Sequence, residues 1–194
     1  FLEQEPLPIM KIYSAQIQLA EVTIRPESSV IGMTLRQAAF RHEYKAMVLA
    51  IRRGESTHYT DLEEIVLQEG DILLVKGHRD DLQYLAKNED FILQQQDSYA
   101  DYDLDDHLLM LRVPPYSLLA GSSLVRSRLG DAFGLSVQGI IRDNKTELMP
   151  DPEEILQADD ILVVKGKQEE LNTIRGLQNL IIETQLQPSI SELE

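Results

Sequence analysis

Hydrophobic residues follow two strand-like patterns near the start of the chain. From Ile17 to Ile24 polar and apolar residues alternate, with Ala20, Val22 and Ile24 on one face, which predicts a half-buried strand. The run "KAMVLAIRR" (Lys45 to Arg53) is apolar on both of its alternating faces. That pattern is typical of a strand that is covered on both sides and lies centrally in its sheet.

A helix is predicted between these two strands. Gly32 allows a tight turn, and we expect Thr34 to cap the helix N-terminus. Leu35, Ala38 and Ala39 then follow at helical spacing and form one apolar stripe. A second such stripe is predicted later in the chain, at Val125, Leu129 and Phe133.

The segments after the central strand predict a hairpin, a strand and a helix. "RGES" (Arg53 to Ser56) has turn residues and precedes a short strand near 57–60. "DILLVKG" (Asp71 to Gly77) predicts a strand buried on both faces. "HRDDLQYLAK" (His78 to Lys87) has acids in its first turn, as helices favour, and "DFILQ" (Asp90 to Gln94) is a candidate final strand.

The phrase "DILLVKG" occurs again as "DILVVKG" (Asp160 to Gly166), 89 positions later with six of seven residues identical. Other segments match in the same order, among them "AMVLAIRR" (Ala46 to Arg53) with "LSVQGIIR" (Leu135 to Arg142). The chain therefore contains two copies of one segment. The predicted divisions are an N-terminal extension, a first copy, an acidic linker, a second copy and a C-terminal tail, at 1–16, 17–93, 94–106, 107–184 and 185–194.

The linker "QQQDSYADYDLDD" is polar and acidic, and like charges favour an extended conformation. A calcium site at its aspartates is an alternative, but the regular spacing and the glycine of a calcium-binding loop are missing.

Each copy has the order β-α-β-β-β-α(-β), so the predicted fold class is α+β. A unit of this size buries little surface, and one helix layer covers only one face of a sheet. We therefore expect the two copies to pack as a pseudo-twofold pair in which each covers the other's open face.

Composition limits the partners. Among 194 residues, 33 acidic against 18 basic give a net charge of −15, which disfavours nucleic acid. Cysteine is absent, so disulfides and thiolate metal sites are excluded and a reducing compartment is favoured. The first residue is Phe1 rather than Met, and we expect the chain to be a piece of a longer protein.

Catalytic and metal-binding patterns are weak. No nucleophile elbow, phosphate-binding glycine loop or His-Glu-x-x-His motif occurs. "DLEEI" (Asp61 to Ile65) and "DPEEI" (Asp151 to Ile155) are clustered acids best explained as solvated turns. The histidines share no ligand spacing. We predict that the chain is not an enzyme and holds no catalytic or metal-binding residues.

The duplicated pattern resembles the RCK C-terminal domain, also called TrkA-C. Its motifs are Ser-x-hydrophobic-x-Gly-x-x-Leu, a strand-end arginine, and Gly-Asp before an apolar strand. The first copy has all three; the second has Asp159 in place of the glycine. The matching residues are Ser28, Val30, Gly32, Leu35, Arg53, Gly70 and Asp71, then Ser117, Leu119, Gly121, Leu124, Arg142 and Asp160.

The resemblance implies a regulatory domain of a bacterial ion transport system. Relatives occur in potassium channels and uptake systems, in cation–proton antiporters, and as tandem pairs in loops of sodium-coupled anion and dicarboxylate carriers; the tandem copies here look most like the last type. Implied partners are transmembrane segments of the same full-length chain and a second copy in a homodimer. The implied location is the cytoplasmic face of the bacterial inner membrane.

Family members that bind a ligand take one such as cyclic di-AMP at the pair interface, so a cyclic dinucleotide or another nucleotide is the candidate ligand. Arg53 and Arg142 are the candidate ligand contacts, because a guanidinium is a forked donor matched to phosphate, and Arg52 stands beside the first of them. The alternative is that these arginines pair with nearby acids. For the whole chain, the alternatives to ligand sensing are a ligand-free dimerisation module and an enzyme acting on a small substrate.

Overall fold

The computed structural model describes residues 17–130, 134–175 and 181–182. The chain divides into two compact units, and the division falls between His107 and Leu108. Each unit is described separately below. Among the described residues, no helix is long and apolar enough to cross a bilayer.

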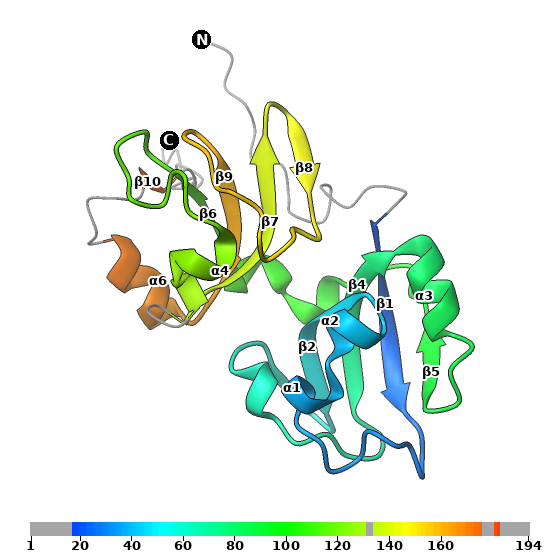
Figure 1. Ribbon diagram of the computed structural model, residues 1–194. Coiled ribbons are helices and arrows are strands. Elements are labelled where there is room, and N and C mark those ends of the chain that lie inside the picture. The colour runs from blue at the N-terminus through cyan, green and yellow to red at the C-terminus, as the bar shows by residue number, and fades with distance from the viewer. Residues whose placement is uncertain (1–16, 131–133, 176–180, 183–194) are drawn as a thin grey trace, which may run out of the picture. The chain divides into compact units, whose positions relative to one another are not determined.

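The first unit is built on a five-stranded antiparallel sheet with the strand order β3-β2-β4-β1-β5 (Figure 1). The predicted strands are all present, and β4 is central. The strands are β1 Ile17–Ile24, β2 Ala46–Arg53, β3 Ser56–His58, β4 Ile72–His78 and β5 Phe91–Gln94. The helices are α1 Leu35–Ala38, α2 Phe40–Glu43 and α3 Arg79–Leu85, with 3-10 turns η2 Leu62–Glu64, η3 Ala100–Tyr102 and η4 Leu104–His107.

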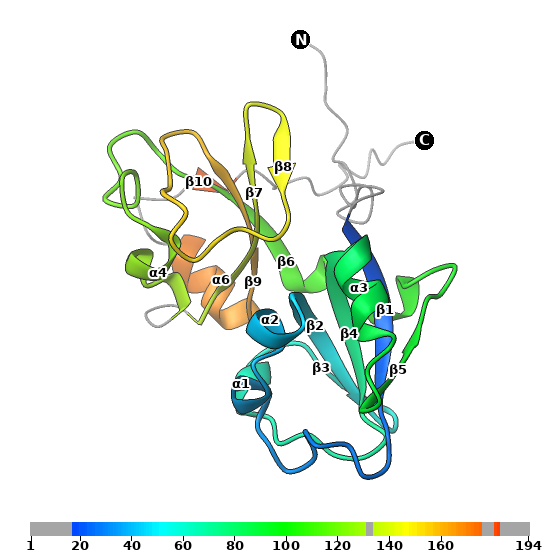
Figure 2. The ribbon, with the colours of Figure 1, turned by 45° about the vertical axis from the view of Figure 1, so that its right-hand side comes forward.

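The second unit repeats this topology with the strand order β10-β6-β9-β7-β8 (Figure 2). Even the irregularity of the second strand is repeated, because β2 is bulged between Val48 and Ala50 and β7 between Val137 and Gly139. The duplication predicted from the sequence is thus confirmed in three dimensions. The elements are β6 Leu108–Arg112, α4 Leu124–Ser127, β7 Ser136–Arg142, β8 Lys145–Glu147, β9 Ile161–Lys165, α6 Gln168–Arg175 and β10 Ile181–Ile182.

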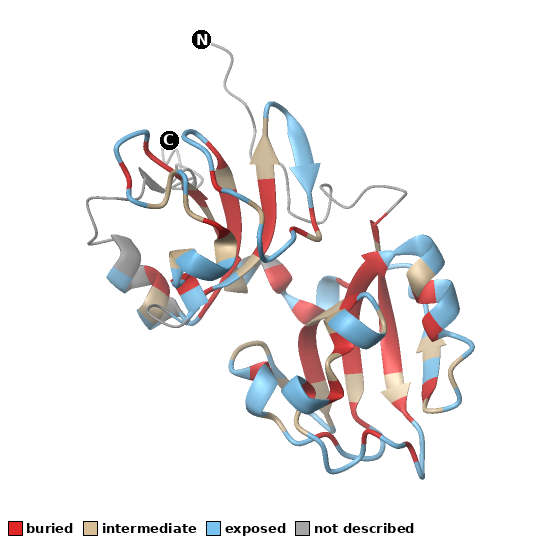
Figure 3. Ribbon diagram, in the orientation of Figure 1, coloured by how far each residue is buried: buried red, intermediate tan, exposed pale blue. Residues whose placement is uncertain are grey.

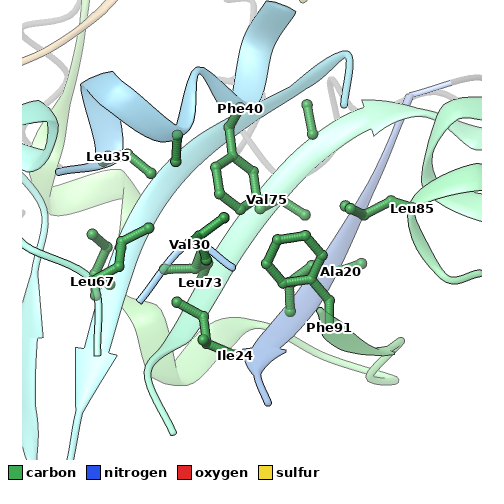
Figure 4. Packing of buried hydrophobic residues seen from close by; sticks show 14 of the residues in the cluster. Ala20, Ile24, Val30, Leu35, Phe40, Leu67, Leu73, Val75, Leu85 and Phe91 are labelled. Atoms are coloured by element: carbon green, nitrogen blue, oxygen red, sulfur yellow. The ribbon is translucent and has the colours of Figure 1, made fainter. Parts of the chain in front are cut away.

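The core of the first unit lies between its helices and one face of its sheet. Ala20, Val22 and Ile24 of β1 are at most 1% exposed and belong to this core, as the alternating pattern predicts. Figure 4 shows Ala20 and Ile24 among the packed side chains. Phe40 from α2 and Phe91 from β5 meet over it with ring centroids 5.4 Å apart. The inner strands are buried along most of their length (Figure 3).

The helix after the first strand is shorter than its apolar stripe predicts. Thr34 caps it as expected, and Gln37 completes a capping box. The chain then turns at Ala39, which adopts a left-handed conformation at φ 49° and separates α1 from α2. In the second unit α4 ends after one turn, so the predicted stripe is wrong at Val125, which is 56% exposed. Phe133 lies outside the described residues.

The glycine that closes each repeated phrase has little room for a side chain. A Cβ on Gly77 would lie 3.2 Å from Cδ2 of Leu82 and 3.3 Å from a backbone oxygen. A Cβ on Gly166 would lie 2.5 Å from Cδ2 of Leu135. In both units the end of the repeated phrase is therefore closely packed.

The linker is not extended, contrary to the sequence prediction. Residues 96–107, which we call the docked segment, form two 3-10 turns against the first unit. Tyr99, Tyr102 and Leu104 are only 8%, 3% and 4% exposed. Charge repulsion is outweighed because these three apolar side chains leave water. Packing of the two copies as a pseudo-twofold pair stays a prediction.

Candidate functional site

Arg53, one of the predicted ligand contacts, is held by a buried carboxylate. It ends β2, and its Nε and Nη2 donate to the two carboxylate oxygens of Asp71, each at 2.7 Å. Nη2 also donates to the carbonyl of Val66 at 2.8 Å. The Asp71 side chain is fully buried, and its Oδ2 accepts a further bond from the Gln68 amide at 2.9 Å. These bonds to Asp71 raise the pKa of Arg53.

The second unit repeats this arrangement. Nε and Nη2 of Arg142 donate to the buried Asp160, again at 2.7 Å each, and Nη2 reaches the carbonyl of Ile155 at 2.9 Å. Gln157 takes the place of Gln68, with its amide 2.7 Å from Oδ2. Nη1 additionally donates to Glu154 at 2.8 Å. In both units the pair ties the end of one strand to the turn before the next.

Arg52 takes part in a different cluster. Consecutive residues of a strand project to opposite faces of the sheet, so the adjacent arginines do not act together. Arg52 donates to Oε1 of Glu21 at 2.8 Å and lies over the ring of Tyr102, 5.0 Å from its centroid. This second face of the sheet is the one away from the helices.

Glu21 is the centre of that cluster. It lies on β1, is 6% exposed, and accepts bonds from the Tyr102 hydroxyl at 2.7 Å and from Nε2 of Gln96 at 2.9 Å. Burial raises the pKa of Glu21, but the bonds from Tyr102 and Gln96 and the charge of Arg52 outweigh it and leave the pKa below its ordinary value. Burial of the Tyr102 side chain and the nearby carboxylate of Glu21 raise the pKa of Tyr102.

The second copy has lost both charged members of this cluster. Glu21 corresponds to Met110 and Arg52 to Ile141 in the aligned sequence. The ion pair of the first unit is thus replaced by an apolar pair. The sequence pattern does not single out Glu21, because it is only one polar position of an alternating strand. The joint loss of both charges is the signal that could have found it.

Two of the remaining candidates have local partners within the first unit. Glu63 and Glu64 of the acidic turn pair with Arg36 at the surface, with distances of 3.0 and 2.6 Å. His107 stacks on Tyr59, with centroids 3.8 Å apart. Within the described ranges, no three histidine or carboxylate side chains come together as a metal-binding group.

One family model matches two separate segments of the chain. The model of the TrkA-C domain matches residues 19–89 and again residues 108–179, well over half of the chain. This chain belongs to the TrkA-C domain family. The repeated Arg–Asp pairs are therefore structural features of two TrkA-C domains in tandem.

Parts of this chain are similar in sequence to proteins named as transporters. The chain is 35% identical over 92 residues to the uncharacterized transporter sll0640 of Synechocystis, covering 47% of this chain and 15% of that protein. It is 30% identical over 77 residues to sodium/sulfate cotransporter 1 of Chlamydomonas reinhardtii, covering 40% and 9%. The chain thus spans a small part of the length of these relatives. A solved structure of the GsuK RCK domain is similar over 83% of this chain and 63% of that one, with 13% identity and a TM-score of 0.37.

Proposed function

We propose that this tandem TrkA-C chain is a non-catalytic regulatory domain of a membrane transporter. The observation that carries the proposal is the double family match together with sequence similarity to proteins named as transporters. The domain works at the cytoplasmic face of a bacterial inner membrane and is joined to transmembrane segments of its full-length chain. By analogy with the sodium/sulfate cotransporter, the carrier moves an anion such as sulfate or a dicarboxylate.

Regulation requires two arrangements of the domain with different affinities for a ligand or a partner. The candidate ligand is a cyclic dinucleotide or another nucleotide, and the candidate contacts are Arg53, Arg142 and Arg52. Arg53 and Arg142 keep 35% and 28% of their side chains exposed, so each side chain is partly accessible from solvent. Because each also holds a buried aspartate, a bound phosphate would add to an existing ion pair rather than replace it.

Thermal unfolding of the chain against cyclic dinucleotides and adenine nucleotides tests ligand sensing. A ligand present at one hundred times its Kd stabilises the folded state by about 2.7 kcal/mol, which raises Tm by several degrees. A single compound that does this, without being converted, supports the proposal. A flat response across all compounds contradicts ligand sensing, and turnover of any compound contradicts a non-catalytic role.

A second candidate function, assembly without a ligand, is favoured by exposed apolar residues of the second unit. At the corresponding positions the first copy has Glu27, Ser29, Arg36 and Val66, of which three are polar. The residues in the second unit are Tyr116, Leu118, Val125 and Ile155, which are 72%, 90%, 56% and 49% exposed.

Light scattering over a range of concentrations tests assembly. The wild-type chain should form a dimer that the double variant Leu118→Ser/Val125→Arg weakens at least tenfold, whereas Tyr84→Ser in the first unit should leave it unchanged. Tyr84 is the matched control because it is 68% exposed. A wild-type chain that stays monomeric at all concentrations, or a variant that dimerises as well as the wild type, excludes assembly through these residues.

A further inference from the structure

The arginines that end β2 and β7 differ in one contact. Arg53 uses Nε and Nη2 for the carboxylate of Asp71 and the carbonyl of Val66, and its Nη1 makes no hydrogen bond to any residue that the structure describes. In Arg142 the same bonds are present, but Nη1 also donates to Oε1 of Glu154 at 2.8 Å. The Nη1 group is therefore occupied by a carboxylate in the second unit and not in the first.

One position of the repeat accounts for this difference. The carbonyls that accept from Nη2 belong to Val66 and Ile155, so these two residues correspond. The residue before them is Ile65 in the first unit and Glu154 in the second, and in both units its carbonyl accepts a 3.0 Å bond from the first residue of the short helix. Ile65 packs against the hydrophobic core of the first unit. An apolar side chain offers no acceptor, so Arg53 lacks the second carboxylate that Arg142 has.

The Nη1 group of Arg53 is in contact with solvent. Arg53 is a half-buried residue, and none of its atoms is among the buried side-chain nitrogens and oxygens that lack a partner in the described part of the chain. Because Nη1 makes no hydrogen bond within that part, it must reach water. Its two N–H donors are thus accessible to a solute.

The acids of the neighbouring turn are balanced by a cation in the first unit only. Glu63 and Glu64 would repel an anion, but both pair with Nη2 of Arg36, at 3.0 and 2.6 Å. The second unit has Val125 at the position of Arg36, so it lacks this cation. The local charge therefore disfavours an anion less in the first unit than in the second.

The guanidinium of Arg53 is also held in a fixed position. Its Nε and Nη2 edge is bound by the two oxygens of the buried Asp71, so little side-chain freedom is lost when Nη1 binds a partner. Two N–H donors on one nitrogen suit the oxygens of a phosphate group. A single such nitrogen suits one phosphate group rather than two.

We propose that Arg53, rather than Arg142, binds a phosphate group of the ligand through Nη1, and that Glu154 closes Arg142 to anions. Ile65 is the residue that keeps the first site open. The inference rests on the ligand sensing proposed above and narrows it, because each chain then offers one phosphate site and not a symmetric pair.

Titration with inorganic phosphate, followed by nuclear magnetic resonance of the arginine side-chain nitrogens, tests this assignment. The ionic strength is kept constant with sodium chloride, so that screening does not change during the titration. The variants Arg53→Lys and Arg142→Lys assign the two sets of signals. In the wild-type chain the Nη signals of Arg53 should shift in a saturable way, whereas those of Arg142 should not.

Exchanging the two residues between the units should exchange the behaviour of the two arginines. Ile65→Glu should weaken phosphate binding at Arg53 about fivefold or more, since a carboxylate then competes for Nη1. Glu154→Ile should make the Arg142 signals respond to phosphate, and it remains informative if Ile65→Glu does not fold. The control Glu153→Ile removes the same charge from the neighbouring exposed residue and should leave Arg142 unresponsive.

The outcomes separate this inference from ligand sensing as a whole. A shift at Arg53 with phosphate supports the inference even if no nucleotide raises Tm, a result that would contradict ligand sensing alone. Equal shifts of Arg53 and Arg142 in the wild type, or no shift at Arg53, would overturn the inference. An Arg142 that stays unresponsive in Glu154→Ile would overturn it as well, because Glu154 would then not be the group that closes the site.

Discussion

Arg53 and Asp71 form a two-pronged ion pair with both N–O distances at 2.7 Å, and Arg142 and Asp160 repeat it at the same two distances. Each aspartate side chain is fully buried, whereas each arginine is partly exposed. The aspartate is therefore the member that depends on its partner, because a buried carboxylate without a counter-charge is strongly disfavoured.

Replacing Arg53 by alanine should lower the free energy of unfolding by about 3 kcal/mol. This is the lower end of the range for breaking a buried pair, since the arginine is a third exposed. Urea unfolding followed by circular dichroism measures the change. The control is Arg36→Ala, which removes a pair with Glu63 and Glu64 at the surface and should cost at most about 1 kcal/mol. If both substitutions lowered the free energy of unfolding equally, burial of Asp71 would not increase the contribution of its ion pair to stability.

Glu21 and Arg52 should tolerate joint replacement better than single replacement. Arg52→Ile leaves a buried carboxylate with one partner fewer, whereas Glu21→Met/Arg52→Ile installs the apolar pair that the second copy carries. A double-mutant cycle in urea should give a coupling energy of about 0.5 to 3 kcal/mol. Additive effects of the two substitutions would contradict a direct interaction between these residues.

Acid should weaken the docked segment through Glu21. Its pKa in the folded chain lies below the ordinary value of 4.5, so the stabilisation is fully present above that value and is lost as the pH falls through the folded pKa. We expect the stability of the wild type to fall below pH 4.5 more steeply than that of Glu21→Gln. Asp90, whose pKa is also lowered, chiefly by the backbone amide of Ser29, titrates in both proteins and accounts for a shared slope. Parallel pH profiles would contradict the prediction.

The Tyr102 hydroxyl should contribute more than an ordinary hydrogen bond. Tyr102→Phe keeps the buried ring but removes the donor to the Glu21 carboxylate, and bonds to charged groups contribute about 1.5 to 3 kcal/mol. Thermal and urea unfolding should show a loss in that range. Tyr84→Phe, at an exposed tyrosine, should change the stability by less than about 0.5 kcal/mol. If Tyr102→Phe left the free energy of unfolding unchanged, the bond from the hydroxyl to Glu21 would contribute no net stability.

Most of the fold was predictable, because its strands follow clear local patterns and the sequence contains two copies of them. Alternation in β1, the doubly apolar β2 and β4, and the Thr34 cap are local patterns that tertiary packing did not override. The break at Ala39 was not predictable, because alanine favours a continuing helix. The residue after the break, Phe40, packs against Phe91, which is a long-range contact that no local pattern encodes.

The docked segment shows why the rest was missed. Its composition is that of a linker, and its three large buried residues, Tyr99, Tyr102 and Leu104, follow neither a helical nor a strand period. Their burial depends on long-range contacts, such as the one from Tyr102 to Glu21, which no local pattern encodes. For Arg53 and Arg142 the sequence predicts pairing with nearby acids as an alternative, but it does not identify which acids. Ligand contact by these arginines stays a prediction.

Hydrogen–deuterium exchange over residues 96–107 tests most directly whether this acidic stretch is part of the first unit. The account predicts slow exchange of the amides around Tyr99 and Tyr102 in the wild-type chain, and exchange at least a hundredfold faster in Tyr102→Ala, with β4 unchanged in both. Exchange of these amides at the rate of an unstructured peptide in the wild type would contradict it.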